Sequence, residues 1–363
     1  MLISEVDTPA LLVDLDRLNA NLDRMANNAR NADLALRPHT KTHKTPEIAQ
    51  LQIDRGAAGL TVAKIGEAEV MAGAGFNDIF IAHHIVGPQK IERLVALAQR
   101  IAISIGVDSS EAATALSMAF AQHGLRLPVL IEVDVGLHRT GVAPADVLDL
   151  ARTINTLPGL SLTGLFTYPG HVYQGRNENE VAGIAAYECR IMGEAAVSMA
   201  HIVDRDPRVS GGSTPTAPHY HVDCGLTEIR PGTYVFNDRT QVARWSASLS
   251  DCALTVLATV VSTPEPGRAV LDAGSKALSS DVAPEVPGHG ELKEDRKAVL
   301  VKLNEEHGYL DLRESELKLR IGDKVEVIPN HACTVTNLFD ELHAVRGGEV
   351  VETWPVAARG RVQ

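Results

Sequence analysis

The sequence has 363 residues, 45% of them hydrophobic and 22% charged, and its formal net charge is -12 at pH 7. Such a chain can bury a large core, its length predicts about two domains, and its acidic balance without a long basic run argues against nucleic-acid binding. No uncharged apolar stretch reaches the roughly 18 residues of a membrane span, no secretory signal is expected, and four cysteines without a CxxC pair favour reduced thiols in a cytoplasmic protein.

Short β-rich runs alternate with helix-like segments over the first two-thirds of the chain, a pattern typical of a parallel sheet covered by helices. About eight repeats in roughly 230 residues favour a closed (β/α)8 TIM barrel over an open doubly wound sheet. No GxGxxG motif follows the first expected strand, which weakens a dinucleotide-binding alternative. The expected strands are residues 10–15, 34–41, 59–64, 78–83, 102–107, 128–134, 162–168 and 208–214.

The pattern changes near residue 239, where β-rich runs are joined by Gly, Pro and charged turns. We therefore expect the barrel at 1–238 and a smaller, mainly-β domain at 239–363, and the first residues of the chain could join this β-domain. Residues 281–297 are expected to be a loop. The expected strands of the β-domain lie within 252–263, 268–274, 298–304, 324–331 and 341–356.

Cationic and polar residues recur where the expected barrel strands end, and barrel enzymes gather their catalytic groups at that face. Loops are ordinarily polar, but polarity alone does not predict so many His, Arg and Lys residues at one end. The residues are Arg37, His39, Lys41, His83, His84, His138, Arg139, Tyr168, His171, Ser213, Thr214 and Arg230.

The stretch RPHTKTHK (37–44) is the densest group of these cations. Lys41 alternates in phase with Arg37 and His39, so all three would point to one side of a strand. Neighbouring positive charge and desolvation both lower the pKa of a lysine, and a neutral amine can form a Schiff base with a carbonyl. A solvated basic loop explains this stretch equally well when it is considered alone.

Two glycine-containing turns, SGGSTPT (210–216) and RPGTYVF (230–236), add a second kind of chemistry. Such turns can offer backbone N–H groups and hydroxyls to one phosphate, although each is a common pattern when taken singly. A reactive lysine and a phosphate cradle at the same barrel mouth favour pyridoxal 5'-phosphate (PLP) as the cofactor.

Several motifs now form one set: TPALLVDLDRLNANL near the start, RPHTKTHKTPEIA, VDVGLHRTGV, GGSTPT, EIRPGTYVF and PNHACTVTN. Together they resemble the D-serine dehydratase/D-threonine aldolase family of fold-type III PLP enzymes, which is related to alanine racemase. The motifs span nearly the whole chain in the order of the family. The resemblance implies a PLP-binding barrel, a C-terminal β-domain carrying a metal site, and a homodimer with active sites near the subunit interface.

The same resemblance assigns roles to individual residues. Lys41 is implied to be the lysine that holds PLP, and Arg139 to lie near the phenolic oxygen of the cofactor. Arg230 stands where the racemase branch has an arginine facing the pyridine nitrogen, although the dehydratase branch can use another group. The remaining cofactor-binding candidates are Tyr168 at the barrel mouth and the phosphate contacts Ser213, Thr214, Gly232 and Thr233.

A metal site is expected at His331 and Cys333 in NHACTVTN, because residues i and i+2 of a strand face the same way. On spacing alone a buried histidine beside an unrelated cysteine is favoured, and the resemblance reverses that preference. A thiolate favours zinc, with manganese and magnesium as alternatives. The aldolase branch of this family has Asp at the position of Cys333. The cysteine therefore favours the dehydratase branch. The cluster His219, Tyr220 and His221 is expected to be a loop near the cofactor rather than a metal site.

The resemblance implies a lyase that acts on D-amino acids with a β-hydroxyl group. In the dehydratase reaction, Lys41 removes the α-proton and the metal assists loss of the hydroxyl, giving a 2-oxo acid and ammonia. In the alternative, a D-threonine aldolase reaction, His171 is the candidate base and the products are glycine and an aldehyde. An amino-acid racemase is more distant, because its second acid/base would be a tyrosine, and Tyr309 does not match the racemase pattern.

Overall fold

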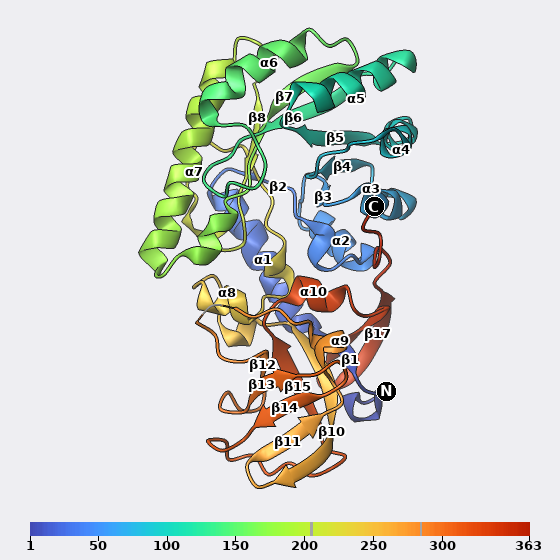
Figure 1. Ribbon diagram of the computed structural model, residues 1–363, viewed down its shortest axis with the longest axis vertical. Coiled ribbons are helices and arrows are strands. Elements are labelled where there is room, and N and C mark those ends of the chain that lie inside the picture. Colours follow the sequence, from blue (N-terminus) through green and yellow to red (C-terminus); the bar gives the residue numbers. More distant parts are fainter. Residues whose placement is uncertain (204–205, 284) are drawn as a thin grey trace. The chain divides into compact units, whose positions relative to one another are not determined.

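The computed structural model describes residues 1–203, 206–283 and 285–363, and the chain divides into two compact units (Figure 1). We call them the barrel unit and the β unit and describe each by itself. The barrel unit comprises Arg24–Lys41, Ile48–Gly232 and Arg361–Gln363. The β unit comprises Met1–Asp23, Thr42–Glu47 and Thr233–Gly360.

An eight-stranded, all-parallel sheet forms the core of the barrel unit, in the order β2-β9-β8-β7-β6-β5-β4-β3. A parallel bridge between His39 and Thr61 joins the chain after β2 to β3, and Thr61 N donates to Pro38 O at 2.9 Å. The two ends of the sheet are thereby connected, which confirms the expected (β/α)8 TIM-barrel class. The strands are β2 Ala35–Leu36, β3 Leu60–Val62, β4 Asp78–Ile81, β5 Ala102–Val107, β6 Leu127–Glu132, β7 Leu160–Phe166, β8 Arg208–Gly211 and β9 Glu228–Ile229.

Helices connect successive barrel strands and cover the sheet from outside (Figure 1). In α6 the residues Val147, Leu150, Ala151 and Ile154 are buried, which is the spacing of one apolar face on a helix. Within the described parts of the chain, no helix is both long and apolar enough to cross a membrane. The helices are α1 Leu15–Asn31, which contributes residues to both units, α2 Pro46–Ile53, α3 Ile65–Gly73, α4 Pro88–Ala98, α5 Ser110–Gln122, α6 Val147–Asn155 and α7 Glu178–Met199.

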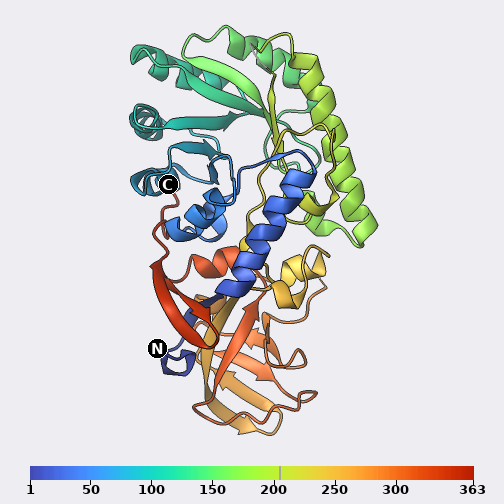
Figure 2. The ribbon, with the colours of Figure 1, turned by 180° about the vertical axis from the view of Figure 1, so that it is seen from behind.

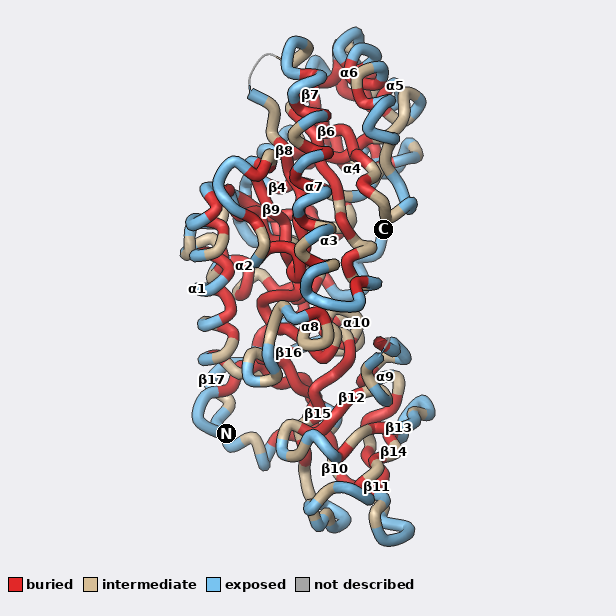
Figure 3. The backbone as a smooth tube through the Cα atoms, turned by 90° about the vertical axis from the view of Figure 1, so that its left-hand side faces the viewer, coloured by how far each residue is buried: buried red, intermediate tan, exposed pale blue. Residues whose placement is uncertain are grey.

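Aromatic side chains fill the interior of the barrel, where Figure 3 shows strands β6, β7 and β8 as mostly buried. Phe80 and Phe166 pack with Leu130, and the two rings meet edge to face with centroids 5.2 Å apart, a favourable aromatic geometry. Gly106 on β5 makes room for them, because a Cβ at this position would lie 2.4 Å from Phe166 Cζ.

The β unit contains a closed, six-stranded antiparallel barrel (Figure 2). Its order is β11-β14-β13-β12-β15-β10, and β10 pairs back with β11 to close the ring. Strands β1, β16 and β17 extend the sheet from β10. The elements are β1 Ala10–Asp14, β10 Leu254–Glu265, β11 Arg268–Leu271, β12 Gly290–Leu292, β13 Val299–Leu303, β14 Gly308–Asp311, β15 Lys324–Pro329, β16 Glu341–Arg346 and β17 Glu349–Pro355, with helices α8 Arg239–Ala243, α9 Ser275–Leu278 and α10 Ala332–Thr336.

Two expected barrel strands differ from the structure, and one barrel strand was not expected. Residues 10–14 form β1, which pairs with β10 and β16 in the β unit and not with barrel strands. The eighth barrel strand is instead β9, whose two residues are too few to give a periodic signal in the sequence. Strand β2 ends at Leu36 and not at residue 41, because Pro38 has no N–H for a ladder and Thr40–Thr42 forms a 3-10 helix.

The segment 281–297, expected to be a loop, contains β12, which pairs with β13 and β15. Its three residues lie between Gly, Pro and charged positions, so composition concealed a strand that completes the small barrel. The expected mainly-β architecture is confirmed, although β14, like β12, was not among the expected strands.

Candidate active site

Lys41, Arg139 and Tyr168 are brought together in the barrel unit, although they come from three separate loops. Lys41 lies in the 3-10 helix after β2, and its Nζ is 5.6 Å from the centroid of the Tyr168 ring. The guanidinium carbon of Arg139, from the loop after β6, is 5.1 Å from the same centroid. An amine and a guanidinium therefore share one aromatic surface at the carboxyl ends of the strands, where barrel chemistry gathers.

Arg37 is paired with two carboxylates, whereas the sequence suggested an unpaired cation beside Lys41. Its Nε donates to Glu228 Oε2 at 2.7 Å, and its Nη1 donates to Asp78 Oδ1 at 2.7 Å. Burial disfavours the charged form of Arg37, but Glu228 and Asp78 outweigh burial and raise the pKa of its guanidinium. Arg37 therefore stays charged, and its charge is balanced by two carboxylates within the barrel unit.

The two glycine-containing turns lie side by side, since Arg230 N donates to Gly211 O at 2.9 Å. Ser213 and Thr214 follow β8 and are both buried, and Ser213 N donates to Thr216 Oγ1 at 2.9 Å. Gly232 belongs to the barrel unit, whereas Thr233 begins the next segment of the β unit. Buried hydroxyls on a glycine-containing turn, in the same unit as the amine of Lys41, fit a phosphorylated aldehyde such as PLP.

Arg230 is engaged inside the barrel. Its Nη1 donates to Ser210 Oγ at 2.6 Å, its Nη2 donates to Thr167 O, and its guanidinium lies 5.5 and 5.4 Å from the ring centroids of Phe80 and Phe166. Burial lowers the pKa of Arg230 to about 10, although Glu228 opposes this effect. Both terminal nitrogens of Arg230 therefore donate hydrogen bonds within the protein. That Arg230 faces the pyridine nitrogen of the cofactor stays a prediction.

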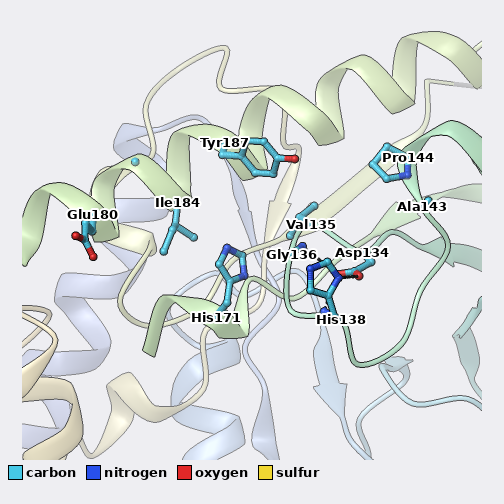
Figure 4. A pocket seen from close by; sticks show the side chains of 11 residues that line it. Asp134, Val135, Gly136, His138, Ala143, Pro144, His171, Glu180, Ile184 and Tyr187 are labelled. Atoms are coloured by element: carbon cyan, nitrogen blue, oxygen red, sulfur yellow. Dashed lines mark hydrogen bonds and ion pairs between the residues drawn. The ribbon is translucent and has the colours of Figure 1, made fainter. Parts of the chain in front are cut away.

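His171 lies in the 3-10 helix Gly170–Gln174 and lines a cavity of about 730 Å³ (Figure 4). The cavity runs between α7, which contributes Ile184 and Tyr187, and the loop Asp134–His138. Gly136 in that loop has φ +120°, and a Cβ there would lie 3.4 Å from the His171 ring. Burial lowers the pKa of His171, so its imidazole is neutral at pH 7 and able to accept a proton.

The loop beside His171 is fixed by Asp134. Its Oδ1 accepts from Gly136 N at 2.9 Å and from His138 N at 3.0 Å, and its Oδ2 lies 2.7 Å from His138 Nδ1. Burial would raise the pKa of Asp134, but these donors outweigh it and lower the pKa. The carboxylate therefore stays ionised and holds the loop that leads to Arg139.

A cluster of His84, Asp108 and Glu132, at the ends of β4, β5 and β6, was not expected as a unit. His84 Nε2 is 3.5 Å from Asp108 Oδ1 and 3.1 Å from Glu132 Oε2, and the three ligand atoms lie within 4.8 Å of one another, so they could hold a cation. Burial disfavours protonation of His84, but both carboxylates raise its pKa, so an imidazolium satisfies the same arrangement. The signal in the sequence was one polar residue after each of three successive strands.

In the β unit, His331 and Cys333 lie shortly after β15. His331 caps α10 and Cys333 lies inside that helix, so the pair is not on a strand as expected. The two side chains nevertheless meet, and His331 Nδ1 is 2.7 Å from Asp281 Oδ2. Burial opposes protonation, but Cys333 and the nearby carboxylates raise the pKa of His331 to about 10.

Cys333 is also close to two hydroxyls, with Sγ 3.2 Å from Thr42 Oγ1 and 3.6 Å from Thr233 Oγ1. Thr42 is the residue after Lys41 in the sequence. The imidazole of His331 and the sulfur of Cys333 are ligand types that suit a divalent metal, and a thiolate suits zinc. Asp281 was missed from the sequence because it lies 50 residues from His331.

Comparison with known proteins places this chain in a family. Residues 13–240 match the model of the alanine racemase N-terminal domain, and residues 253–345 match a serine dehydratase domain. D-threonine aldolase of Arthrobacter sp. is 36% identical over 99% of this chain and 94% of its own length. The chain belongs to the D-serine dehydratase/D-threonine aldolase family.

Other relatives of this PLP-dependent family match over similar lengths. D-threo-3-hydroxyaspartate dehydratase of Delftia sp. is 33% identical over 96% of this chain and 97% of its own length. Its solved structure has a TM-score of 0.91 and covers 98% of each chain. An alanine racemase structure from Bacillus anthracis, at 14% identity and a TM-score of 0.70 over 96% of this chain and 98% of its own, shows the shared fold alone.

Proposed function

We propose that this chain is a PLP- and metal-dependent lyase that removes the β-hydroxyl of a D-amino acid and releases a 2-oxo acid and ammonia. The observation that carries this proposal is the donor set at His331 and Cys333, in a chain whose barrel unit also presents Lys41 beside Tyr168 and Arg139. A phosphate turn and an amine alone would fit any PLP enzyme. A thiolate and an imidazole in addition favour a metal that assists loss of a hydroxyl.

The assignment of His331 and Cys333 as metal ligands has support from a relative. A dehydratase 32% identical to this chain has been solved as a cysteine-to-alanine mutant in the metal-free form and as a histidine-to-alanine mutant. The two mutated residues are two positions apart, as His331 and Cys333 are in this chain. Zinc is the favoured metal because a thiolate is a soft ligand, with manganese and magnesium as alternatives.

Each residue of the barrel unit has a distinct part in the proposed reaction. PLP, when bound, supplies the electron sink that makes the Cα–H bond of the substrate acidic. Lys41 would hold the cofactor until the amine of the substrate displaces it, and the released Nζ would then take the proton from Cα. Arg139 would interact with the phenolic oxygen, and the turns containing Ser213, Thr214, Gly232 and Thr233 would bind the phosphate.

D-threonine aldolase activity is the second candidate, and His171 favours it. Its imidazole is neutral, lines a cavity and has a buried Nδ1 without a hydrogen-bond partner among the described residues. In a retro-aldol reaction this base would take the proton of the β-hydroxyl, the Cα–Cβ bond would break, and glycine and an aldehyde would form. Cys333 favours the dehydratase instead. In the family that the sequence resembles, the aldolase branch has Asp at this position.

Product analysis separates the two reactions. The PLP-loaded protein would be given D-serine, D-threonine and D-threo-3-hydroxyaspartate, with and without a chelator, and the corresponding L-isomers would serve as controls. A 2-oxo acid with ammonia supports the dehydratase. Glycine with an aldehyde supports the aldolase and overturns the first proposal. Activity that a chelator leaves unchanged would refute the metal role of His331 and Cys333.

We propose in addition that the enzyme is a cytoplasmic homodimer with active sites near the subunit interface. The resemblance to the family supports the dimer, and the four cysteines, which include no CxxC pair, support a reducing compartment. Light scattering coupled to size-exclusion chromatography tests the mass, and a monomer at assay concentration would contradict the proposed dimer.

A further inference from the structure

The turn that follows β8 is anchored by a buried carboxylate that the proposed reaction does not use. Glu188, on α7, is completely buried, and its Oε1 accepts a hydrogen bond from Gly212 N at 2.7 Å. Its Oε2 accepts a hydrogen bond from the Tyr220 hydroxyl at 2.5 Å. A carboxylate buried to this degree is costly unless its oxygens are hydrogen-bonded, so the two donors fix its position.

Tyr220 extends this network to the other end of the turn. Its hydroxyl oxygen lies 2.7 Å from Thr216 Oγ1. Thr216 Oγ1 in turn accepts a hydrogen bond from Ser213 N at 2.9 Å, and Ala217 N donates to Ser213 O at 3.1 Å. The segment Gly212–Thr216 is therefore tied to Glu188 at its first residue directly and at its last residue through Tyr220.

The backbone of the turn is shaped to admit this carboxylate. Gly212 adopts φ +86°, which residues with a side chain rarely adopt. A Cβ at Gly211 would lie 2.5 Å from Glu188 Oε1 and would push the carboxylate away. Burial raises the pKa of Glu188 to about 7, and the donors Tyr220 and Gly212 together with the charge of Arg230 oppose that rise.

We propose that Glu188 and Tyr220 are positioning residues for the phosphate group of PLP, acting through the Gly212–Thr216 turn without touching the cofactor. This inference rests on the proposed function, which assigns Ser213 and Thr214 of the turn to the phosphate. A turn already fixed in one conformation binds an anion without the ordering cost of a loose loop. The network should therefore strengthen the binding of the phosphate and leave the binding of the pyridine ring unaffected.

The test compares PLP with pyridoxal, which has the same ring and aldehyde but no phosphate. Glu188→Met keeps the volume of the side chain and removes both acceptors, so Gly212 N–H loses its partner. We expect Glu188→Met to bind PLP about tenfold more weakly than the wild type, the effect of losing a hydrogen bond to a charged group. Its affinity for pyridoxal should equal that of the wild type. Equilibrium dialysis with absorbance detection measures both.

Glu188→Gln is the matched control, because its amide oxygen still accepts from Gly212 N–H, and it should recover most of the PLP affinity. Tyr220→Phe loses only the far anchor and should weaken PLP binding by a smaller factor; it also serves if Glu188→Met does not fold. Equal PLP affinity in Tyr220→Phe and wild type, or an equal loss for PLP and pyridoxal, would overturn the inference. A wild type that binds no PLP would refute the proposed function instead.

Discussion

Glu228 offers a test of how the barrel interior is held together, because its carboxylate is almost completely buried among cations. Its Oε2 accepts from Arg37 Nε at 2.7 Å, and its Oε1 accepts from Ser210 Oγ at 2.5 Å. Glu228→Gln preserves the shape of the side chain but removes the charge and turns an amide N–H group toward one of these donors. Removing one partner of a buried ion pair costs about 3–5 kcal/mol, so we expect the free energy of unfolding of the barrel unit to fall by that amount.

The pH dependence of this effect has a definite sign. Burial would raise the pKa of Glu228, but Arg37 and Arg208 outweigh burial and lower it. A carboxyl group whose pKa is lower in the folded protein stabilises the fold above its unfolded pKa, about 4.3, and loses that contribution as pH falls through the folded value. The difference in stability between wild type and Glu228→Gln should therefore be full at neutral pH and shrink below about pH 4.

Urea unfolding followed by far-UV circular dichroism provides the measurement, since α2 to α7 are all in the barrel unit apart from the first residues of α2. Glu69→Gln is the matched control, because Glu69 pairs with Arg93 at 2.6 Å while more than a third of its side chain is exposed. An exposed pair contributes at most about 1 kcal/mol. A loss of less than about 1 kcal/mol in Glu228→Gln, or a loss equal to that of the control, would refute the assignment of a buried, charged network.

Three further predictions concern the proposed chemistry. Lys41→Ala should abolish both turnover and the visible absorption band that PLP acquires on joining a lysine, whereas Lys64→Ala, at another strand end, should keep the band; retention of the band in Lys41→Ala would contradict the cofactor assignment. Cys333→Asp replaces a soft ligand by a hard one, so the metal recovered after dialysis and measured by mass spectrometry should shift from zinc toward manganese or magnesium. An unchanged zinc content would argue against Cys333 as a ligand. His171→Gln should reduce any release of glycine by at least about a hundredfold and the release of 2-oxo acid by less than about tenfold, and the opposite order would exclude His171 as the retro-aldol base.

The sequence was informative where chemistry or periodicity is local. Alternating β-rich and helical runs predicted the parallel barrel, and the HxC spacing drew attention to His331 and Cys333. The motif RPHTKTHK pointed to Lys41 because cations gathered at the end of an expected strand. Each of these signals lies within a few consecutive residues, which is the range over which side-chain periodicity and motif spacing carry information.

The tertiary structure decided what depends on residues distant in the sequence. Strand β1 belongs to the β unit because Leu12 and Val13 pair with β10 and β16, more than 200 residues away. The two-residue strand β9 takes its place because pairing with β2 and β8, and not its own composition, makes it a strand. Long-range backbone pairing of this kind leaves no periodic trace in a short segment.

The same distinction holds for charges. Arg37 seemed from the sequence to be a cation beside Lys41, yet Glu228, 191 positions away, neutralises it. Glu188 belonged to no motif, and Tyr220 was noted only as part of the loop with His219 and His221; the fold brings both side chains to the Gly212 turn, from 24 residues before it and eight after it. Sequence can identify a group that carries a charge, but a buried charge is stabilised by whatever the fold brings within hydrogen-bonding distance, and that partner is set by the packing of the whole chain.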